Sequence, residues 1–207
     1  MRKEISLKTD KGEIGIYILA TPEDLQNLRF DPQFREHTHY RSLYTRRQSL
    51  IIRAGEADSN VVIALTEAGT IIAFGMVVYP DPAERWAHLK PKIMMEAKAI
   101  EVSRDWRSVG LGQAIARGMM AHPLVEEKIV YMVGYTWTWD LEASRMTPAQ
   151  YKKMMIRLFS TVGLVEHPTN EPNICLDDDN LFMVRIGKNV PEKIRTDFKW
   201  LCFGQYE

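Results

Sequence analysis

Residues 95–120 constrain the fold of this chain more than any other segment, because a strand pattern, two glycines and a helix pattern follow one another there. Over residues 97–102, small or apolar residues alternate with Lys98 and Glu101, which is typical of a short strand. Apolar residues then recur at the spacing of a helix: Leu111, Ala114, Ile115, Met119 and Met120. A strand, a glycine-bearing turn and a helix present backbone N–H groups at the helix N-terminus, where they bind phosphate.

The turn itself has the pattern R-x-x-G-x-G, made by Arg107, Ser108, Val109, Gly110, Leu111 and Gly112. A side chain at either glycine would hold a pyrophosphate away from the backbone N–H groups. A dinucleotide fingerprint is excluded because Ile115 stands where it needs a third glycine or alanine. A P-loop is excluded because Gly187 and Lys188 are followed by Asn189. A different phosphate-bearing ligand is favoured, and a glycine-rich turn without a ligand is the alternative.

The charge balance gives no indication of a strongly charged partner. The 207 residues include 27 basic and 27 acidic side chains, so the formal net charge is zero, which favours neither nucleic acid nor an anionic membrane. No apolar run approaches the ~20 residues that cross a bilayer, and the N-terminal residues contain no apolar signal segment. We therefore expect a soluble, cytoplasmic protein with a single domain over residues 1–207.

The expected elements alternate along the chain. We expect strands over residues 11–20, 60–66, 70–79, 97–102, 127–135 and 181–186, with a short one opening at 164–165. Helices are expected over most of residues 24–54, with an interruption at Asp31 and Pro32, and also over 83–89, from 109 to 122, from 147 to 163 and from 190 onward. Residues 168–179 are expected to form a loop, and Trp200, Leu201 and Phe203 to pack on the body of the protein.

This order predicts an α/β (α+β) fold in which a mixed central sheet is flanked by helices on both faces. Residues 190–207 would form a C-terminal helical extension of the domain.

Residues 95–120 resemble the coenzyme A-binding segment of the GNAT superfamily of N-acetyltransferases. The likeness rests on the R-x-x-G-x-G turn, on an I-x-V strand that ends five residues before Arg107, and on the apolar helix behind the turn. The order of elements is also that of the GNAT acyltransferase fold. Further stretches are similar to the acetoin-utilisation acetyltransferases of the AcuA type: YPDPAERW from Tyr79, AIEV from Ala99, YTWTWD from Tyr135, YKKMMIRLFSTVGLV from Tyr151, TNEPNI from Thr169 and LFMVRIGKNV from Leu181.

The resemblance implies a protein lysine N-acetyltransferase that uses acetyl-CoA as co-substrate and needs no metal. For the AcuA type it further implies a role in acetoin and acetate metabolism, with acetyl-CoA synthetase as the protein substrate, inactivated by acetylation of its catalytic lysine. Two alternatives stay open. One is an N-acetyltransferase for a small amine, which predicts turnover with free polyamines or aminoglycosides. The other is a non-catalytic acyl-CoA-binding regulator.

The resemblance also implies a set of coenzyme A-binding residues. The backbone N–H of Ile100 would face the thioester carbonyl as an oxyanion donor, an effect typically worth about 3 kcal/mol. Val102 and Arg104 would contact the pantetheine, and the pyrophosphate would lie on Arg107, Ser108, Val109, Gly110, Leu111, Gly112 and Gln113. The commonest form of the motif has glycine and a basic residue in place of Ser108 and Val109. Plain core packing is the alternative for Ile100 and Val102.

Glu96 is the expected general base, because a lysine with an ordinary pKa of ~10.4 must lose a proton before it attacks. The resemblance supports this assignment, since the histone-acetylating branch of the superfamily has a glutamate at this position. Alternation puts Glu96 and Val102 on one face of the strand and Glu101 on the other. About 13 Å of extended strand separates Glu96 from Ile100, which favours a water relay. A solvated charge at the strand end is the alternative.

The general acid is marked less clearly. Phe159 occupies the position at which many GNAT enzymes have a tyrosine, and a phenyl ring cannot donate a proton to the departing thiolate. Tyr135, near the end of the neighbouring strand, is the candidate substitute, and protonation by water is the alternative.

Two segments are candidates for docking a folded protein substrate. Trp137 and Trp139 alternate in the aromatic run 135–139, so we expect both to face one way, where they would clamp a lysine stem or a partner surface. The other candidate is the basic and aromatic segment around Arg41, Tyr44 and Arg47. Capping of the core and an ordinary solvated helix face are the respective alternatives.

Overall fold

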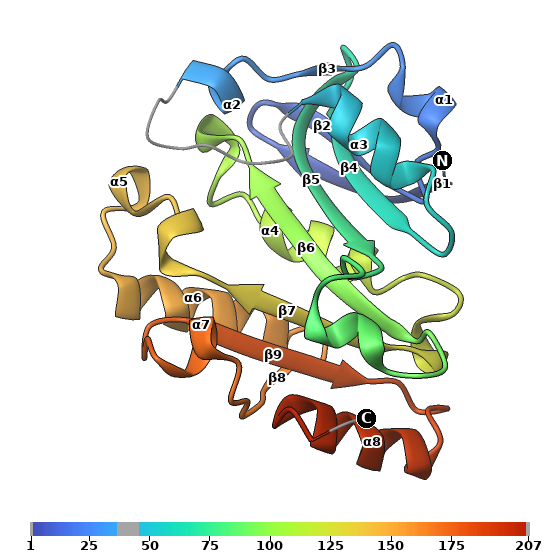
Figure 1. Ribbon diagram of the computed structural model, residues 1–207. Coiled ribbons are helices and arrows are strands. Elements are labelled where there is room, and N and C mark those ends of the chain that lie inside the picture. Colours follow the sequence, from blue (N-terminus) through green and yellow to red (C-terminus); the bar gives the residue numbers. More distant parts are fainter. Residues whose placement is uncertain (1, 37–45, 206–207) are drawn as a thin grey trace. The chain divides into compact units, whose positions relative to one another are not determined.

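The computed structural model describes residues 2–36 and 46–205 of the chain (Figure 1). Two compact units are present: Met1–Val78 with Lys98–His122, and Tyr79–Ala97 with Pro123–Glu207. The division falls inside strand β6 (Met94–Val102), so one continuous element contributes residues to both units. That the whole chain behaves as a single domain stays a prediction.

The first unit contains antiparallel strands in the order β1-β2-β4-β5, namely β1 (Arg2–Thr9), β2 (Gly12–Ile18), β4 (Asn60–Thr66) and β5 (Thr70–Val78). A short strand, β3 (Arg29–Phe30), pairs with β5 in parallel. The β1–β2 hairpin turns at Gly12, which has a φ of 114°. β2, β4 and β5 agree with the predicted strands. The sequence does not predict β1, because charged residues interrupt its apolar pattern and its pairing with β2 is what orders it.

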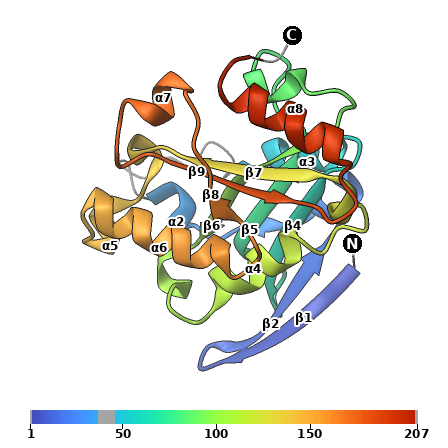
Figure 2. The ribbon, with the colours of Figure 1, turned by 90° about the horizontal axis from the view of Figure 1, so that it is seen from below.

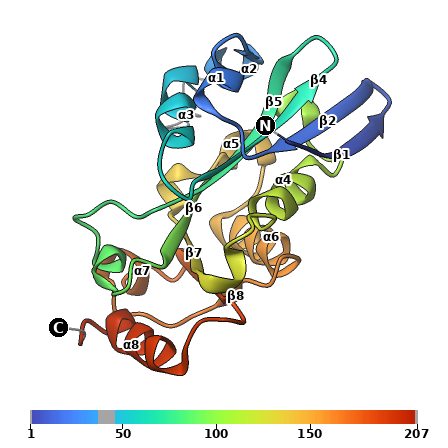
Figure 3. The same ribbon diagram turned by 90° about the vertical axis from the view of Figure 1, so that its right-hand side faces the viewer.

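In the described part of the first unit, these strands are accompanied by the helices α1 (Pro22–Leu25), α2 (Gln33–Glu36), α3 (Arg47–Ala54) and α4 (Leu111–Met119). A 3-10 turn, η2 (Arg104–Trp106), precedes α4. Figure 3 shows α1, α2 and α3 on one side of β4 and β5, and α4 on the other side. Alternation along β4 accounts for this arrangement, because Val61 and Ile63 lie in the core cluster with α1–α3, whereas Val62 meets α4 at Gly118.

α4 approaches the strands closely at two glycines. A Cβ on Gly75 of β5 would lie 2.6 Å from the Ile115 side chain, and a Cβ on Gly118 would lie 2.8 Å from that of Val62. The C-terminal end of α4 is held by buried Asn60, whose side-chain amide donates to two carbonyl oxygens of the helix over 2.9 and 3.0 Å. These contacts position the helix and therefore also its N-terminus.

The second unit contains strands in the order β6-β7-β9-β8, where β7 is Ile129–Gly134, β9 is Leu181–Ile186 and β8 is Val165–Glu166. β6 is parallel to β7 over residues 94–96, and β9 is antiparallel to both β7 and β8. Parallel and antiparallel pairs are therefore mixed, as predicted. The strands expected near 127–135, 164–165 and 181–186 are confirmed.

The helical segments of the second unit are η1 (Arg85–His88), η3 (Val125–Glu127), η4 (Thr136–Thr138), α5 (Leu141–Ser144), α6 (Pro148–Ser160), α7 (Pro172–Cys175) and α8 (Glu192–Cys202). α6 and α8 lie on opposite faces of β7 and β9 (Figure 2). α6 begins as predicted, with a capping box between Thr147 and Gln150 and proline in its first turn. α8 buries Phe198 and Leu201 against residues of β7 and β9. The predicted α/β (α+β) fold with helices on both faces is confirmed.

Residues 24–54 are helical over most of their described part, as predicted, in the short pieces α1, α2 and α3, and the predicted interruption at Asp31 and Pro32 is present. Two expectations about single elements are wrong. The expected loop 168–179 contains α7. Trp200 and Phe203 do not pack on the body: they are exposed, since α8 buries only one face.

Candidate active site

The predicted phosphate-binding turn lies wholly in the first unit, at the N-terminus of α4. Gly110 is the N-cap residue, with a left-handed φ of 84° that favours glycine. A Cβ at this position would meet no atom within 4 Å, so the space beside Gly110 is open. The Ala114 N–H makes the first bond of the helix, to the Gly110 carbonyl oxygen over 3.1 Å. The N–H groups of residues 111–113 have no partner within the helix and suit the oxygens of an anion.

The backbone conformation at position 108 explains why the commonest form of the motif has glycine there. Ser108 has a φ of 68°, a left-handed conformation that costs a residue with a Cβ roughly 1–2 kcal/mol. Serine here preserves the geometry of the turn at the expense of some stability.

Two residues that sequence reasoning missed hold residues 103–106, which lead into this turn. The side-chain oxygen of Gln33 in α2 accepts from the Ser103 hydroxyl over 3.1 Å and from the Asp105 N–H over 2.8 Å. The Lys11 ammonium donates to the Asp105 carbonyl oxygen over 2.6 Å and lies 5.1 Å from the ring centre of Trp106. Gln33 and Lys11 are 72 and 94 positions from Asp105, so no local sequence pattern marks them.

The C-terminal half of β6 leads into the turn. Ala99 packs on the core of the first unit, so alternation puts Ile100 and Val102 on the opposite face, and both are only half-buried. Arg104 begins η2, and Arg107 donates from Nε to the Val102 carbonyl oxygen over 3.3 Å. The predicted cofactor residues are therefore contiguous along one strand end, one turn and one helix N-terminus.

Glu96 and Tyr135, the predicted base and acid, lie in the second unit. Glu96 is half-buried and stands opposite Tyr131 in the β6–β7 ladder. The buried Tyr131 hydroxyl donates to Glu84 Oε2 over 3.1 Å. Burial raises the pKa of Tyr131 far above its ordinary value, and the negative charges of Glu96 and Glu84 raise it further. The Glu96 carboxylate thus lies close enough to Tyr131 to raise the pKa of its buried hydroxyl.

Tyr135 is half-buried and stacks on Trp137, with ring centres 4.5 Å apart and planes at 9°. Burial raises the pKa of Tyr135 to about 12, and the charges of Glu171, Glu84 and Glu96 contribute. Tyr135 therefore carries its proton at neutral pH, as a donor must. Sequence reasoning assigned no role to Glu84 or Glu171, and the available signal was their place in the stretches YPDPAERW and TNEPNI.

The expectation that Trp137 and Trp139 face one way is wrong. Residues 136–138 form η4 rather than continuing β7, so strand alternation does not apply. Trp137 is 66% exposed, whereas Trp139 stacks on Tyr151 at 5.0 Å.

The second expected docking segment is only partly described. Arg41 and Tyr44 lie outside the described residues, and Arg47 is the first residue of α3. Phe159, at the position where a tyrosine is usual, is buried in α6.

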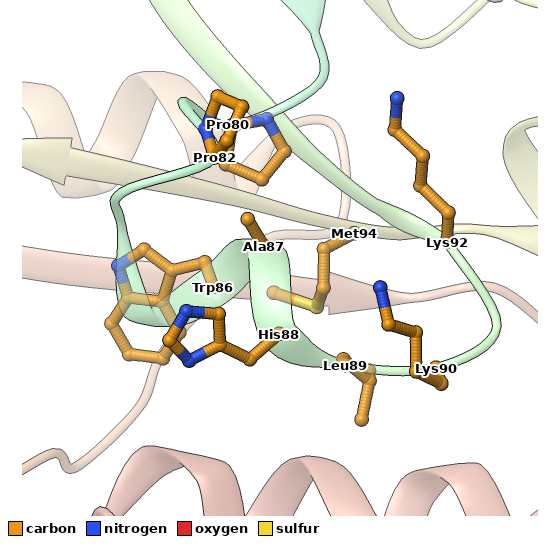
Figure 4. A pocket seen from close by; sticks show the side chains of 9 residues that line it. All are labelled: Pro80, Pro82, Trp86, Ala87, His88, Leu89, Lys90, Lys92 and Met94. Carbon is orange, nitrogen blue, oxygen red and sulfur yellow. The ribbon is translucent and has the colours of Figure 1, made fainter.

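A pocket of 310 Å³ is lined by residues between positions 80 and 94 of the second unit (Figure 4). Trp86 and His88 project on one side of it, and the ammonium groups of Lys90 and Lys92 on the other (Figure 4). Lys92 also lies 3.9 Å from the ring centre of Tyr79. None of the predicted site residues lines this pocket.

Within residues 2–36 and 46–205, no three His, Cys, Asp or Glu side chains are grouped as metal ligands. No helix of the same ranges has the length and apolar character needed to cross a membrane.

Comparison with known proteins identifies the family, although no protein-family model matches the chain. The acetoin utilization protein AcuA of Bacillus subtilis is 32% identical over 198 residues, which are 96% of this chain and 92% of that protein. The chain belongs to the AcuA family. AcuA of Bacillus licheniformis is likewise 32% identical, over 95% of this chain and 92% of its own length.

Solved structures agree with this assignment. An acetoin utilization protein from Exiguobacterium sibiricum superposes with a TM-score of 0.89 at 28% identity, over 99% of this chain and 97% of that chain. A GNAT superfamily phosphinothricin acetyltransferase from Sinorhizobium meliloti, in complex with AcCoA, has a TM-score of 0.52 at 17% identity, over 84% and 89% of the two chains. The fold is that of the GNAT acetyltransferases. The relatives at 32% identity thus assign the chain to the AcuA family, and the acetyltransferase neighbour shares its fold.

Proposed function

We propose that this AcuA-family enzyme acetylates the catalytic lysine of acetyl-CoA synthetase and thereby inactivates it. The binding of acyl-CoA is supported mainly by Gly110. This residue has left-handed backbone at the N-terminus of α4, and a Cβ there would meet no atom within 4 Å, which leaves space for a ligand. Acetylation removes the positive charge of a lysine, which accounts for inactivation of an enzyme that needs it. The choice of a protein acceptor is supported by the zero net charge, which favours a shaped docking surface over general attraction to basic tails.

The residues proposed to bind acetyl-CoA fit a pyrophosphate-bearing ligand. The N–H groups of residues 111–113 point out of the helix N-terminus, where the helix dipole also favours negative charge. The full proposed set comprises Ile100, Val102, Arg104, Arg107, Ser108, Val109, Gly110, Leu111, Gly112 and Gln113. No side chain of residues 108–112 is cationic, so the phosphate charge rests on backbone N–H groups and on Arg107.

When bound, acetyl-CoA supplies the acetyl group through its thioester. In the proposed reaction the lysine nitrogen forms a bond to the acetyl carbon, and the bond from that carbon to sulfur breaks. Ile100 donates its backbone N–H to the carbonyl oxygen as negative charge develops there. Glu96 takes the ammonium proton through water, which leaves the nitrogen lone pair free to attack.

Tyr135 is proposed to stabilise the leaving thiolate by donating a hydrogen bond. A full proton transfer is disfavoured, because the pKa of Tyr135 is raised to about 12 whereas a thiol has a pKa of ~8.5. Water then completes the protonation of the thiolate. Phe159 cannot share this work, since it is buried and has no donor.

The docking surface on this enzyme is proposed to include Trp137. This indole is exposed and stacked on Tyr135, and exposed aromatic groups of this kind anchor protein partners.

The proposal is tested by incubating the enzyme with labelled acetyl-CoA and acetyl-CoA synthetase, followed by mass spectrometry of the synthetase. We expect acetylation of its catalytic lysine and a parallel loss of synthetase activity. If that lysine stays unmodified while a free polyamine is acetylated readily, the small-amine function replaces this one. If neither acceptor is modified although acetyl-CoA binds, the chain is an acyl-CoA-binding regulator.

A further inference from the structure

Glu84 and Glu171, which the proposed mechanism leaves unused, come from two segments that are tied together in the second unit. The guanidinium of Arg85 donates from Nη1 to the Asn170 side-chain oxygen over 2.6 Å. Each of these bonded residues is the direct neighbour in sequence of one of the two glutamates. Residues separated by more than eighty positions are therefore brought to one place by the tertiary fold.

A chain of side-chain amides holds Glu171 in a defined position relative to Tyr135. Asn173 Nδ2 donates to Glu171 Oε1 over 3.1 Å, and Asn180 Nδ2 donates to the Asn173 carbonyl oxygen over 2.6 Å. The buried Asn180 in turn accepts through Oδ1 from the N–H of Thr136 over 2.9 Å, directly after Tyr135. Glu171 is thus pre-positioned by the same network that fixes the start of η4.

The second oxygen of Glu171 has no such partner. Oε2 is buried and accepts no hydrogen bond from any residue in the described part of the chain. Buried polar atoms in native proteins are nearly always hydrogen-bonded, and leaving a charged one unsatisfied is costly. A donor from outside the chain would therefore complete this site.

Tyr135 links Glu171 to further carboxylates of the second unit. Glu171, Glu84 and Glu96 all lie close enough to raise the pKa of the Tyr135 hydroxyl by their negative charge. Tyr131 donates to Glu84, and Glu96 stands opposite Tyr131 in the β6–β7 ladder. The stack of Tyr135 on the exposed Trp137 connects this group of carboxylates to the proposed docking surface. A lysine ammonium, compact and with three donors, fits several carboxylates better than the planar fork of arginine does.

We propose that Glu171, together with Glu84, binds the ε-ammonium of the acceptor lysine and presents it to Glu96. The inference rests on the proposed lysine acetylation and names the residues that determine acceptor specificity. Carboxylates that bind an ammonium also favour its charged form, so recognition by Glu171 and Glu84 opposes proton removal. Glu96 remains the group that takes the proton, which divides recognition and proton transfer among different carboxylates.

The test compares Glu171→Gln and Glu84→Gln with wild type by two measurements. NMR titration with Nα-acetyl-lysine amide, in the presence of coenzyme A, reports recognition of the ammonium alone. Steady-state kinetics with acetyl-CoA synthetase report KM and kcat. Gln at position 171 keeps an oxygen that can accept from Asn173, so the fold is preserved. Glu166→Gln, at an exposed glutamate on β8, is the matched control.

Glu171→Gln is expected to weaken lysine-amide binding and to raise KM by about 10- to 100-fold, the effect of losing a charge-assisted hydrogen bond. It should leave acetyl-CoA affinity unchanged and move the acidic limb of the kcat–pH profile to lower pH, because the bound ammonium loses a stabilising charge. Glu171→Asp should recover part of the affinity. A structural role alone would not shift the pH profile.

The failure of this inference is distinguishable from failure of the proposed substrate. Unchanged lysine-amide binding and KM in Glu171→Gln would overturn the inference even if the synthetase is acetylated. Absence of lysine-amide binding by wild type would overturn it as well. If wild type does not modify the synthetase but Glu171→Gln still loses lysine-amide binding, the proposed protein substrate is wrong and the proposed ammonium site is supported.

Discussion

At the scale of single residues, we expect Gly110 to decide whether the turn before α4 accepts phosphate. Gly110→Asp would place a carboxylate among the N–H groups of residues 111–113, and we expect acetyl-CoA binding to be lost in calorimetry. The fold should survive, because aspartate is a favourable N-cap residue and tolerates left-handed backbone better than most residues. Gly110→Asn is the matched control, since it adds nearly the same volume without the charge. Equal loss in both variants would attribute the effect to shape rather than to charge.

For the single residue Glu96, we expect the contribution to kcat to be largest near neutral pH. Glu96→Gln should lower kcat by about 10²–10⁴-fold at pH 7, the usual contribution of a general base. The deficit should shrink as the pH rises toward the pKa of lysine, ~10.4, because the acceptor then deprotonates unaided. The measurement is a pH–rate profile with Glu101→Gln as control. A uniform deficit across the pH range would indicate a structural role for Glu96 instead.

At the scale of elements, the position of α4 depends on its close contact with β5. A Cβ on Gly75 would lie 2.6 Å from the γ-methyl of Ile115, a branched side chain with little freedom to move. Gly75→Ala should therefore cost about 1–3 kcal/mol of unfolding free energy and weaken acetyl-CoA binding, since α4 must shift. Chemical denaturation and calorimetry measure the two effects.

The control for this helix is Gly55→Ala at the end of α3. A Cβ there would have its nearest neighbour at 3.5 Å, an ordinary contact, and the φ of −83° suits any residue. Gly55→Ala should change stability by less than about 1 kcal/mol. Equal stability of the Gly75 and Gly55 variants would show that α4 has room to move away from β5.

At the scale of the whole molecule, selection of one lysine on a folded protein requires a surface as well as a catalytic group. Trp137→Ala should lower kcat/KM for the folded synthetase by about 30-fold, the effect of losing an anchor of about 2 kcal/mol, and affect a short lysine peptide far less. Trp200→Ala, at an indole of α8 that is 54% exposed, is the control. An equal loss of kcat/KM with the protein and with the peptide would indicate that the substitution disturbs Tyr135, on which Trp137 stacks, rather than docking of the protein.

The sequence by itself determined the features that depend on neighbouring residues. The glycine turn before α4, the hairpin of β4 and β5 and the capped start of α6 follow from local spacing and turn chemistry, and the structure contains all three. Stretches of similarity also sufficed to indicate the family.

Only the tertiary structure decided the features that depend on distant pairing. Lys11 and Gln33 reach the turn from remote positions, and Glu84 and Glu171 meet through Arg85 and Asn170. The divergence of Trp137 and Trp139 likewise follows from a 3-10 turn that is stabilised by Asn180. Periodicity describes which face of an element a residue occupies, but hydrogen bonds across long sequence separations form only once packing has brought the segments together.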